Sequence, residues 1–500
     1  MKQLRIIVPL VSLIIALAMA TLATAQDELS PGVGNVNFTV QNLDPVETAV
    51  VIASFINSSG MTDTTWPQEA APLSAQGFPI SDSGLPDNWQ GAVIIASDRE
   101  LVGFAQARWQ DGTYGDRKTA GAYNAFAGGV NALYFPSLAA RQGKQFSILS
   151  IQSAEGASES ESIDVTVAFY DREGTPAKDP FTFQLLKGTQ ITLDLMHQNL
   201  GGDDDMWLGA AVVTSDSPIA GMSAMHWQTY SGAYSGVAGG GTNAYLPSAT
   251  RRIRGGTAGV WRQYTAVLVQ NLDPLTDATV WTHWYDRNGN ELYSFSDVIP
   301  ANSSHGYNTR WTDSNVPGDE QGHHALHEAL GTDWNGSVVV TSTVNIVAIA
   351  NLQWTADSPV GNAATTYASE PAGYDEIYVP ANFRRVEGGT LGVWRQFTGL
   401  AVQNIGASAC DSFSVQWFAR TGEVLLDYDD ALTEVGQSHG YNTRWGADGS
   451  DVPASADTGL LGDDFRGSVY VSAPGCELIA IHNTLWPFWT DSTTYNAFGQ

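Results

Sequence analysis

Short segments with alternating polar and apolar residues run through most of the chain. Residues 165–169 read Val-Thr-Val-Ala-Phe, which is the period of a half-buried β-strand. Residues 93–97 form a β-branched run that ends in small residues, and this also favours a strand. The aromatic strand at 169–174 leads into an Asp-x-x-Gly turn, where glycine accepts the left-handed conformation that closes a hairpin. Helical spacing is scarce, so we expect single helical turns only, near residues 196–200 and 322–330.

Two phrases recur four times and define internal repeats. The first phrase is Val40-Gln41-Asn42, Ile151-Gln152-Ser153, Val269-Gln270-Asn271 and Val402-Gln403-Asn404. The second phrase is Trp89-Gln90-Gly91-Ala92, Trp207-Leu208-Gly209-Ala210, Trp334-Asn335-Gly336-Ser337 and Phe465-Arg466-Gly467-Ser468. The first phrases start at Val40, Ile151, Val269 and Val402, so the steps between them are 111, 118 and 133 residues and each repeat spans roughly 110–130 residues. Propeller blades are only about 40–50 residues long, so this spacing excludes four blades and favours a β-sandwich in each repeat.

The repeats predict an all-β protein of four tandem immunoglobulin-like β-sandwich domains. The predicted borders are residues 1–25 for a signal peptide and 26–130, 131–248, 249–383 and 384–500 for the four repeats. Proline-containing phrases link them, namely Leu133-Tyr134-Phe135-Pro136, Ala244-Tyr245-Leu246-Pro247 and Ile377-Tyr378-Val379-Pro380. Because such links limit bending, we expect the domains to form a rod or an arc.

A resemblance follows from these phrases. The Val-Gln-Asn phrase, the Trp-x-Gly-Ser-Val-Val phrase and the Tyr-Asn-Ala-Phe phrase at Tyr123–Phe126 and Tyr495–Phe498 resemble those of secreted bacterial proteins built of tandem immunoglobulin-like sandwiches. The resemblance covers nearly the whole chain after Ala25. It implies a fold and an exported location, and it implies no catalytic residues.

The N-terminal segment 1–25 has the pattern of a secretory signal peptide. Lys2 and Arg5 precede the apolar segment 6–19, and Ala23-Thr24-Ala25 matches a cleavage site. A membrane anchor is the alternative, but the apolar segment is short for a membrane span. We therefore expect a secreted or extracellular protein, retained at the cell surface or free, with no membrane insertion after cleavage.

Composition narrows the partners of this protein. Of its 500 residues, 43% are hydrophobic and 15% are charged, which is a core-forming composition. The net charge of −29 argues against a nucleic-acid partner, because phosphate binding needs a basic surface. The two cysteines, Cys410 and Cys476, predict one disulfide in an oxidising compartment, with two free thiols as the alternative.

Most tryptophans occupy equivalent positions in several repeats, which predicts core anchors. These are Trp89, Trp207 and Trp334 at one position, Trp109, Trp227, Trp354 and Trp486 at a second, and Trp284 and Trp417 at a third. Trp66, Trp281 and Trp489 do not recur, so they are the better candidates for surface contacts.

An octet with the sequence Ser-His-Gly-Tyr-Asn-Thr-Arg-Trp occurs at 304–311 and again at 438–445. Arginine offers planar donors and aromatic rings offer stacking faces, so the octets are candidate ligand-binding sites. The candidate residues are His305, Tyr307, Asn308, Arg310, Trp311, His439, Tyr441, Asn442, Arg444 and Trp445. A structural role at a domain joint, with arginine stacked on tryptophan, and simple duplication of repeats 3 and 4 are the alternatives.

Acidic loops are candidate calcium sites, because calcium prefers oxygen ligands. They contain Asp203, Asp204 and Asp205, Asp463 and Asp464, and the segment 448–451. Solubilising surface charge is the alternative. The histidine cluster at 323–328 would place His323 and His327 on one helical face, but we expect a solvated turn there.

No catalytic motif such as Gly-x-Ser-x-Gly or a phosphate-binding glycine loop occurs, so we expect no enzyme. The leading hypothesis is a non-enzymatic secreted or cell-surface interaction or structural protein with an adhesive or matrix role. Its partner would be an extracellular protein, a glycan or a second copy of itself. One alternative is a glycan-binding protein that uses exposed aromatic residues in repeats 3 and 4. The other is a subunit of an extracellular polymer, in which residues 26–35 add as a strand to the next subunit.

Overall fold

The computed structural model describes residues 33–110, 119–141, 145–201, 206–227, 230–253, 261–310, 324–355, 362–388, 392–445, 451–453, 456–487 and 491–500. The fold is all-β, with 67% of the described residues in strands and 4% in helices. The predicted signal peptide lies outside the described residues. Within them, no helix is long and apolar enough to cross a membrane.

Each repeat contributes a similar series of strands in the same order along the chain. Repeat 1 contains β1 (Val33–Asn42), β2 (Ala49–Asn57), β3 (Thr62–Ala70), β4 (Ala75–Phe78), η1 (Ile80–Asp82), β5 (Gly91–Ser97), β6 (Leu101–Gln110) and β7 (Thr119–Asn124). Repeat 2 contains β8 (Val130–Arg141), β9 (Gln145–Ser153), β10 (Ser162–Asp171), β11 (Phe181–Leu186), β12 (Gln190–Asp194), η2 (Leu195–His197), β13 (Met206–Trp227) and β14 (Ser231–Ser235).

Repeats 3 and 4 follow the same plan. Repeat 3 contains β15 (Gly241–Ile253), β16 (Trp261–Asn271), β17 (Ala278–Asp286), β18 (Glu291–Ile299), β19 (Ser304–Asn308), α2 (His324–Leu330), β20 (Asp333–Trp354) and β21 (Ala363–Ala368). Repeat 4 contains β22 (Glu376–Val386), β23 (Trp394–Asn404), β24 (Cys410–Ala419), β25 (Val424–Leu432), β26 (Ser438–Asn442), η4 (Thr458–Leu461), β27 (Asp464–Ser472), β28 (Leu478–Trp486), β29 (Asp491–Asn496) and β30 (Phe498–Gly499). The helical segments expected near 196–200 and 322–330 are present as η2 and α2, and α2 is a helix of seven residues where a single turn was expected. The borders expected after residues 248 and 383 fall inside β15 and β22, which pair with later strands of their own repeats.

Each repeat has a first and a second sheet of corresponding strand order, which are separate in repeat 1 and join into one sheet of 7, 7 and 9 strands in repeats 2, 3 and 4. Every pairing among the described residues is antiparallel. The first sheet is β3-β2-β5 in repeat 1, β11-β10-β13-β8 in repeat 2, β18-β17-β20-β15 in repeat 3 and β25-β24-β27-β22 in repeat 4. The second sheet is β4-β1-β6-β7, β12-β9-β13-β14, β19-β16-β20-β21 and β26-β23-β28-β29. In repeats 2 and 3 one strand of 22 residues passes through both sheets. Repeat 1 differs from the others because its first sheet has three strands.

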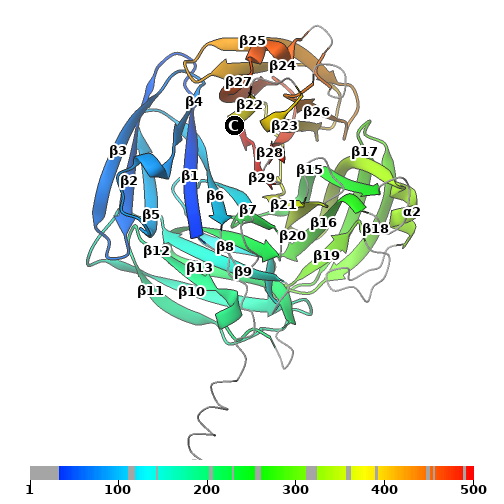
Figure 1. The fold of residues 1–500 in the computed structure, drawn as a ribbon. Coiled ribbons are helices and arrows are strands. Elements are labelled where there is room, and N and C mark those ends of the chain that lie inside the picture. Colours follow the sequence, from blue (N-terminus) through cyan, green and yellow to red (C-terminus); the bar gives the residue numbers. More distant parts are fainter. Residues whose placement is uncertain are drawn as a thin grey trace, which may run out of the picture.

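The repeats form a closed ring (Figure 1), so the expectation of a rod or an arc is wrong. Repeat 4 packs against repeat 1, and β22 contacts β1, β4 and β6. The last strand of each second sheet, β7, β14, β21 and β29, lies at the centre, and each contacts the next one around the ring. The residues of these strands are almost all buried, including Ala120, Ala233, Thr365 and Thr494. Side chains therefore fill the centre of the ring.

The glutamine of the first repeated phrase crosses to the preceding repeat. Its side-chain N–H donates to Val469 O from Gln41, to Val93 O from Gln152, to Ala211 O from Gln270 and to Ser337 Oγ from Gln403. The Gln41 bond closes the ring, because it joins repeat 1 to repeat 4. The same contact thus joins all four pairs of neighbours.

The glycine of a hairpin turn makes a second repeated contact, with the following repeat. Gly60, Gly174, Gly289 and Gly422 all have φ between 81° and 87°. A Cβ atom added to each would lie 2.1 Å from Ser158 O, 3.0 Å from Ala301 O, 2.5 Å from Val435 O and 3.2 Å from Ala71 Cβ, respectively. Glycine is required there both for the backbone conformation and for the close approach of the neighbour.

The tyrosine of the central strands holds the first strand of its own repeat. The hydroxyls of Tyr234, Tyr367 and Tyr495 donate to the carbonyls of Ser137, Ser248 and Ala381 at 2.8, 2.6 and 3.5 Å. The amides of those same three residues donate back to the tyrosine oxygens. Each acceptor directly follows the proline of a linking phrase, and these phrases belong to strands β8, β15 and β22.

Recurring tryptophans pack in the cores, as predicted for Trp207, Trp284, Trp334, Trp354, Trp417 and Trp486, all at most 8% exposed. Trp89, Trp109 and Trp227 are only half-buried. Of the non-recurring tryptophans, Trp281 is exposed, Trp66 is half-buried against Phe78, and Trp489 lies outside the described residues. The predicted disulfide between Cys410 and Cys476 is confirmed, with a Cα–Cα distance of 5.5 Å.

Candidate functional site

Both octets place a histidine and a tyrosine on one carboxylate. In repeat 3, Asp297 on β18 lies 2.7 Å from His305 Nδ1 and 3.0 Å from the Tyr307 hydroxyl, both on β19. Burial disfavours the charged carboxylate, but the hydrogen bonds from His305 and Tyr307 outweigh it and hold the pKa of Asp297 below its usual value. Tyr307 itself is fully buried.

Repeat 4 repeats this geometry with Asp430 on β25. Its carboxylate lies 2.8 Å from His439 Nδ1 and 2.6 Å from the Tyr441 hydroxyl, and its pKa is lowered in the same way. The preceding repeats touch the start of each octet, because Arg172 donates to Ser304 O and Arg287 donates to Ser438 O. The octets thus lie next to the joints between repeats.

The remaining octet residues are also engaged within the fold. The side-chain oxygens of Asn308 and Asn442 accept from the amides of Arg310 and Arg444. The Arg310 guanidinium lies over the Tyr264 ring at 4.8 Å and donates to its hydroxyl. These contacts stabilise the turn after β19 and leave little of the octet for a ligand.

Trp445 is the described octet residue with an accessible aromatic face, because its side chain is 40% exposed. The Arg444 guanidinium lies between the Phe397 ring at 3.8 Å and the Trp445 ring at 4.8 Å. Burial lowers the pKa of Arg444 to about 10. Trp311, its counterpart in repeat 3, lies outside the described residues.

The candidate calcium ligands divide into two groups. Asp463 accepts from Arg384 and Asp464 accepts from Arg385, each at 2.6 Å, so both carboxylates are paired with arginine. Asp203, Asp204 and Asp205 lie outside the described residues. Over the part of the chain that the structure describes, no group of three or more His, Cys, Asp or Glu side chains could hold a metal ion.

The histidine cluster is also structural in part. His327 is 4% exposed, and its Nε2 lies 2.9 Å from Asn308 O in the octet. The expected solvated turn is therefore wrong for His327, because α2 packs this side chain against the core of repeat 3. His323 lies outside the described residues.

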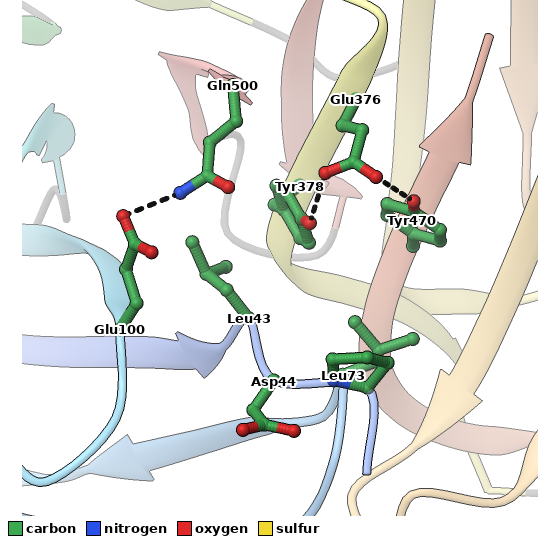
Figure 2. A pocket seen from close by; sticks show the side chains of 9 residues that line it. Leu43, Asp44, Leu73, Glu100, Glu376, Tyr378, Tyr470 and Gln500 are labelled. Carbon is green, nitrogen blue, oxygen red and sulfur yellow. Dashed lines mark hydrogen bonds between the residues drawn. The ribbon is translucent and has the colours of Figure 1, made fainter. Parts of the chain in front are cut away.

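A pocket that the sequence did not predict lies where repeat 4 meets repeat 1 (Figure 2), with a volume of about 330 Å³. Its polar lining consists of Asp44, Glu100, Glu376, Tyr378, Tyr470 and Gln500. These residues come from the loops beside β1 and β6, from β22 and β27, and from the C-terminus. Only the closed ring brings them together.

Two tyrosines share one carboxylate in this pocket. The hydroxyls of Tyr378 and Tyr470 donate to the two oxygens of Glu376 at 3.0 and 2.8 Å, and their ring centroids are 5.0 Å apart. Burial, followed by the bonds to Glu376, raises the pKa of both tyrosines. On the opposite wall, Gln500 Nε2 donates to Glu100 at 2.8 Å.

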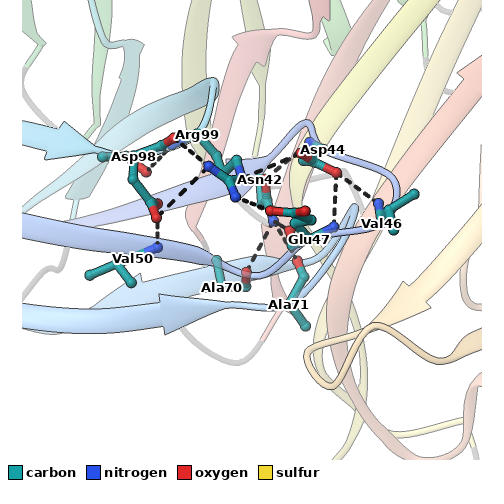
Figure 3. A network of polar contacts seen from close by, with 10 residues as sticks. Asn42, Asp44, Val46, Glu47, Val50, Ala70, Ala71, Asp98 and Arg99 are labelled. Atoms are coloured by element: carbon teal, nitrogen blue, oxygen red, sulfur yellow. Dashed lines mark hydrogen bonds and ion pairs between the residues drawn. The ribbon is translucent and has the colours of Figure 1, made fainter.

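A compact network supports the repeat 1 side of the pocket (Figure 3). The Asp44 carboxylate accepts from the amides of Val46 and Glu47 at 2.8 Å. Arg99 forms ion pairs with the carboxylates of Asp44 and Glu47. Asn42 Nδ2 donates to Ala70 O at 3.1 Å and fixes the loop to the end of β3. The pocket wall is thus held in place without a ligand.

The pocket combines carboxylates, tyrosine hydroxyls and aromatic faces. These groups suit a hydroxyl-rich or cationic group, because the carboxylates accept hydrogen bonds and the rings offer apolar faces. The sequence contained a signal for this pocket. Glu376 occupies the position of Ala132 in repeat 2 and Asn243 in repeat 3, and Tyr470 occupies the position of Val212 and Val339. The pocket can therefore be recognised in the sequence, because Glu376 and Tyr470 differ in kind from the equivalent residues of repeats 2 and 3. A comparison with protein-family models and with curated proteins found no match to this chain.

Proposed function

We propose that this protein is an exported, non-enzymatic scaffold that binds an extracellular or cell-surface protein. The observation that carries the proposal is ring closure: the residues that recur in the repeats are used to join neighbours and to fill the centre. Such a ring holds its surface in one arrangement before it meets a partner, which lowers the entropic cost of binding. The disulfide is compatible with an oxidising compartment, and the signal-like segment 1–25 supports export.

The immunoglobulin-like class of the four repeats belongs to the same proposal. It is supported by the two layers of strands in every repeat, which join into one sheet in repeats 2, 3 and 4, and by the core between the layers. Glycan binding is the second candidate function. The exposed face of Trp445, backed by Arg444, and the tyrosine pair of the pocket favour it.

A binding assay on intact producer cells tests both functions. Labelled mature protein, starting at Gln26, is added to untreated cells, to cells shaved with protease, and to cells oxidised with periodate. We expect saturable binding that protease abolishes and periodate leaves intact. Loss of binding after periodate alone would replace the proposal by glycan binding, and the absence of saturable binding would refute both.

A further inference from the structure

Among the described residues, repeat 1 lacks a strand that the other three repeats possess. In repeats 2, 3 and 4 the first sheet ends in β8, β15 or β22, which pairs with β13, β20 or β27. In repeat 1, β5 is the equivalent of β13, β20 and β27, and it pairs with β2 alone. Among the described residues nothing pairs with its other edge.

The exposure of the β5 side chains agrees with an unpaired edge. Val93 and Ile95 are only partly buried, whereas their counterparts Val338 and Val340 in repeat 3 are completely buried. Gln152, which reaches Val93 from repeat 2, is also partly buried, although Gln41, Gln270 and Gln403 are 0% exposed at the other three joints. In the part of the chain that the structure describes, the strand position between β5 and repeat 2 is therefore unfilled.

The tyrosines at the centre of the ring provide a second, independent observation that points to the same unfilled strand position. Tyr234, Tyr367 and Tyr495 each bond the backbone of the first strand of their repeat. Tyr123 is the equivalent residue of repeat 1, and within the described part of the chain its hydroxyl has no hydrogen-bond partner. Three residues after the tyrosine, Val237, Glu370 and Phe498 pair with Tyr134, Tyr245 and Tyr378 of that strand. Phe126 of repeat 1 has no such pairing among the described residues.

With the proposed cleavage after Ala25, the segment before β1 is shorter than the strands that fill this position in the other repeats. Cleavage after Ala25 leaves residues 26–32, Gln-Asp-Glu-Leu-Ser-Pro-Gly, before β1 begins at Val33. The strands that fill this position elsewhere are 11–13 residues long and bury most of their apolar side chains. The seven residues contain one aliphatic side chain, and Val33–Asn35 already pair with Arg108–Gln110 of β6. Residues 33–35 are thus not available for the strand exchange expected for a polymer.

We propose that the free edge of β5 is an acceptor site for an extended strand of a partner protein. The three strands that fill the equivalent position give its chemistry: an apolar residue, tyrosine, a second apolar residue, proline and a small residue, as in Leu-Tyr-Phe-Pro-Ser, Ala-Tyr-Leu-Pro-Ser and Ile-Tyr-Val-Pro-Ala. The partner's apolar side chains enter the core beside Val93 and Ile95, and the backbone of its small residue bonds Tyr123. An unpaired edge without charged residues or proline, such as Gly91–Ser97, is suited to strand addition.

This inference names the partner of the proposed scaffold, and it rests on the proposed export because it needs the mature N-terminus. The probe is a synthetic peptide with the sequence of Gly241–Ile253. A control peptide carries the charge-neutral changes Ala244→Asn and Leu246→Asn. We expect saturable binding of the first peptide to the mature protein at a 1:1 ratio, slower amide exchange in β5, and no binding of the control.

Two protein variants locate the site. Tyr123→Phe removes the unpartnered hydroxyl and should weaken peptide binding about three- to tenfold, as expected for one hydrogen bond. Tyr234→Phe makes the same change in repeat 2, where β8 already occupies the position, and should leave peptide binding unchanged. Unfolding midpoints of both variants report whether the ring is intact.

Equal binding of both peptides would overturn the acceptor site. Amide exchange in β5 of the free protein that is already as slow as in β27 would also overturn it, because another segment would then pair there. Peptide binding without cell binding would refute the proposed function and keep the site. Cell binding without peptide binding would do the reverse.

Discussion

Alanine at Gly289 should open the joint between repeats 3 and 4. Gly289 has φ +87°, and an added Cβ would lie 2.5 Å from Val435 O and 3.0 Å from the Gln437 amide nitrogen. The left-handed backbone costs alanine about 1 kcal/mol. Displacing the neighbouring backbone adds about 1–3 kcal/mol, as overpacking does. We therefore expect Gly289→Ala to lower the free energy of unfolding by about 2–4 kcal/mol.

Gly84 provides the matched control. It has φ +75° and no atom within 4 Å of the added Cβ, so Gly84→Ala should cost only about 1 kcal/mol. Urea denaturation of both variants measures the difference. Hydrogen exchange at the Ser438 amide, which donates to Arg287 O across the joint at 3.0 Å, should accelerate in Gly289→Ala alone. Equal costs for the two variants, with unchanged exchange at Ser438, would refute the role assigned to the turn glycines.

Three further predictions follow from single residues. Burial raises the pKa of Glu370 from 4.5 to about 7. Its stabilising contribution is therefore complete below pH 4.5, and about 3 kcal/mol is lost as the pH rises through 7. Urea midpoints measured at pH 5 and pH 8 should differ less in Glu370→Gln than in the unmodified protein, and an equal difference would contradict this prediction. Replacing Cys410 and Cys476 by serine should lower the free energy of unfolding by about 4 kcal/mol, given a separation of 66 residues, and a change below about 1 kcal/mol would count against it. Trp445→Ala should leave cell binding unchanged if the partner is a protein, whereas lost binding by a folded variant would favour a glycan.

The sequence predicted the parts of each repeat better than their arrangement. Local patterns were enough for the strands, the turn glycines and the core positions of Trp284 and Trp417, because burial and turn geometry act over a few residues. The disulfide could be predicted because export to an oxidising compartment was expected and because the chain has two cysteines. The function of the repeated glutamine was not visible, because Gln41 bonds Val469, which is 428 residues away.

The length of the repeats misled the prediction of overall shape. A repeat of roughly 110–130 residues is too long for a propeller blade, but it does not exclude a circular order of larger units. Closure depends on contacts that look like local turn chemistry in the sequence, such as Gly289 and its counterparts. His327 was likewise placed in solvent, because its bond to Asn308 O joins segments that the sequence separates. The pocket at the joint between repeats 4 and 1 depends on closure too.

Ring closure changes where function should be sought. Residues that recur four times are explained by joints and cores that are themselves repeated four times, so they carry little information about a partner. Two departures from the repetition lie at the joints of repeat 1: the pocket at Glu376 and Tyr470, and the edge of β5 with Tyr123, which is unpaired among the described residues. The pocket adds carboxylate and tyrosine side chains at one joint, whereas the described residues of the next joint leave a whole strand position unfilled. A missing strand leaves both backbone donors and apolar core positions unfilled, and only another extended chain satisfies both at once. The β5 edge is therefore the more specific of the two features, because it dictates the conformation of its partner as well as its chemistry.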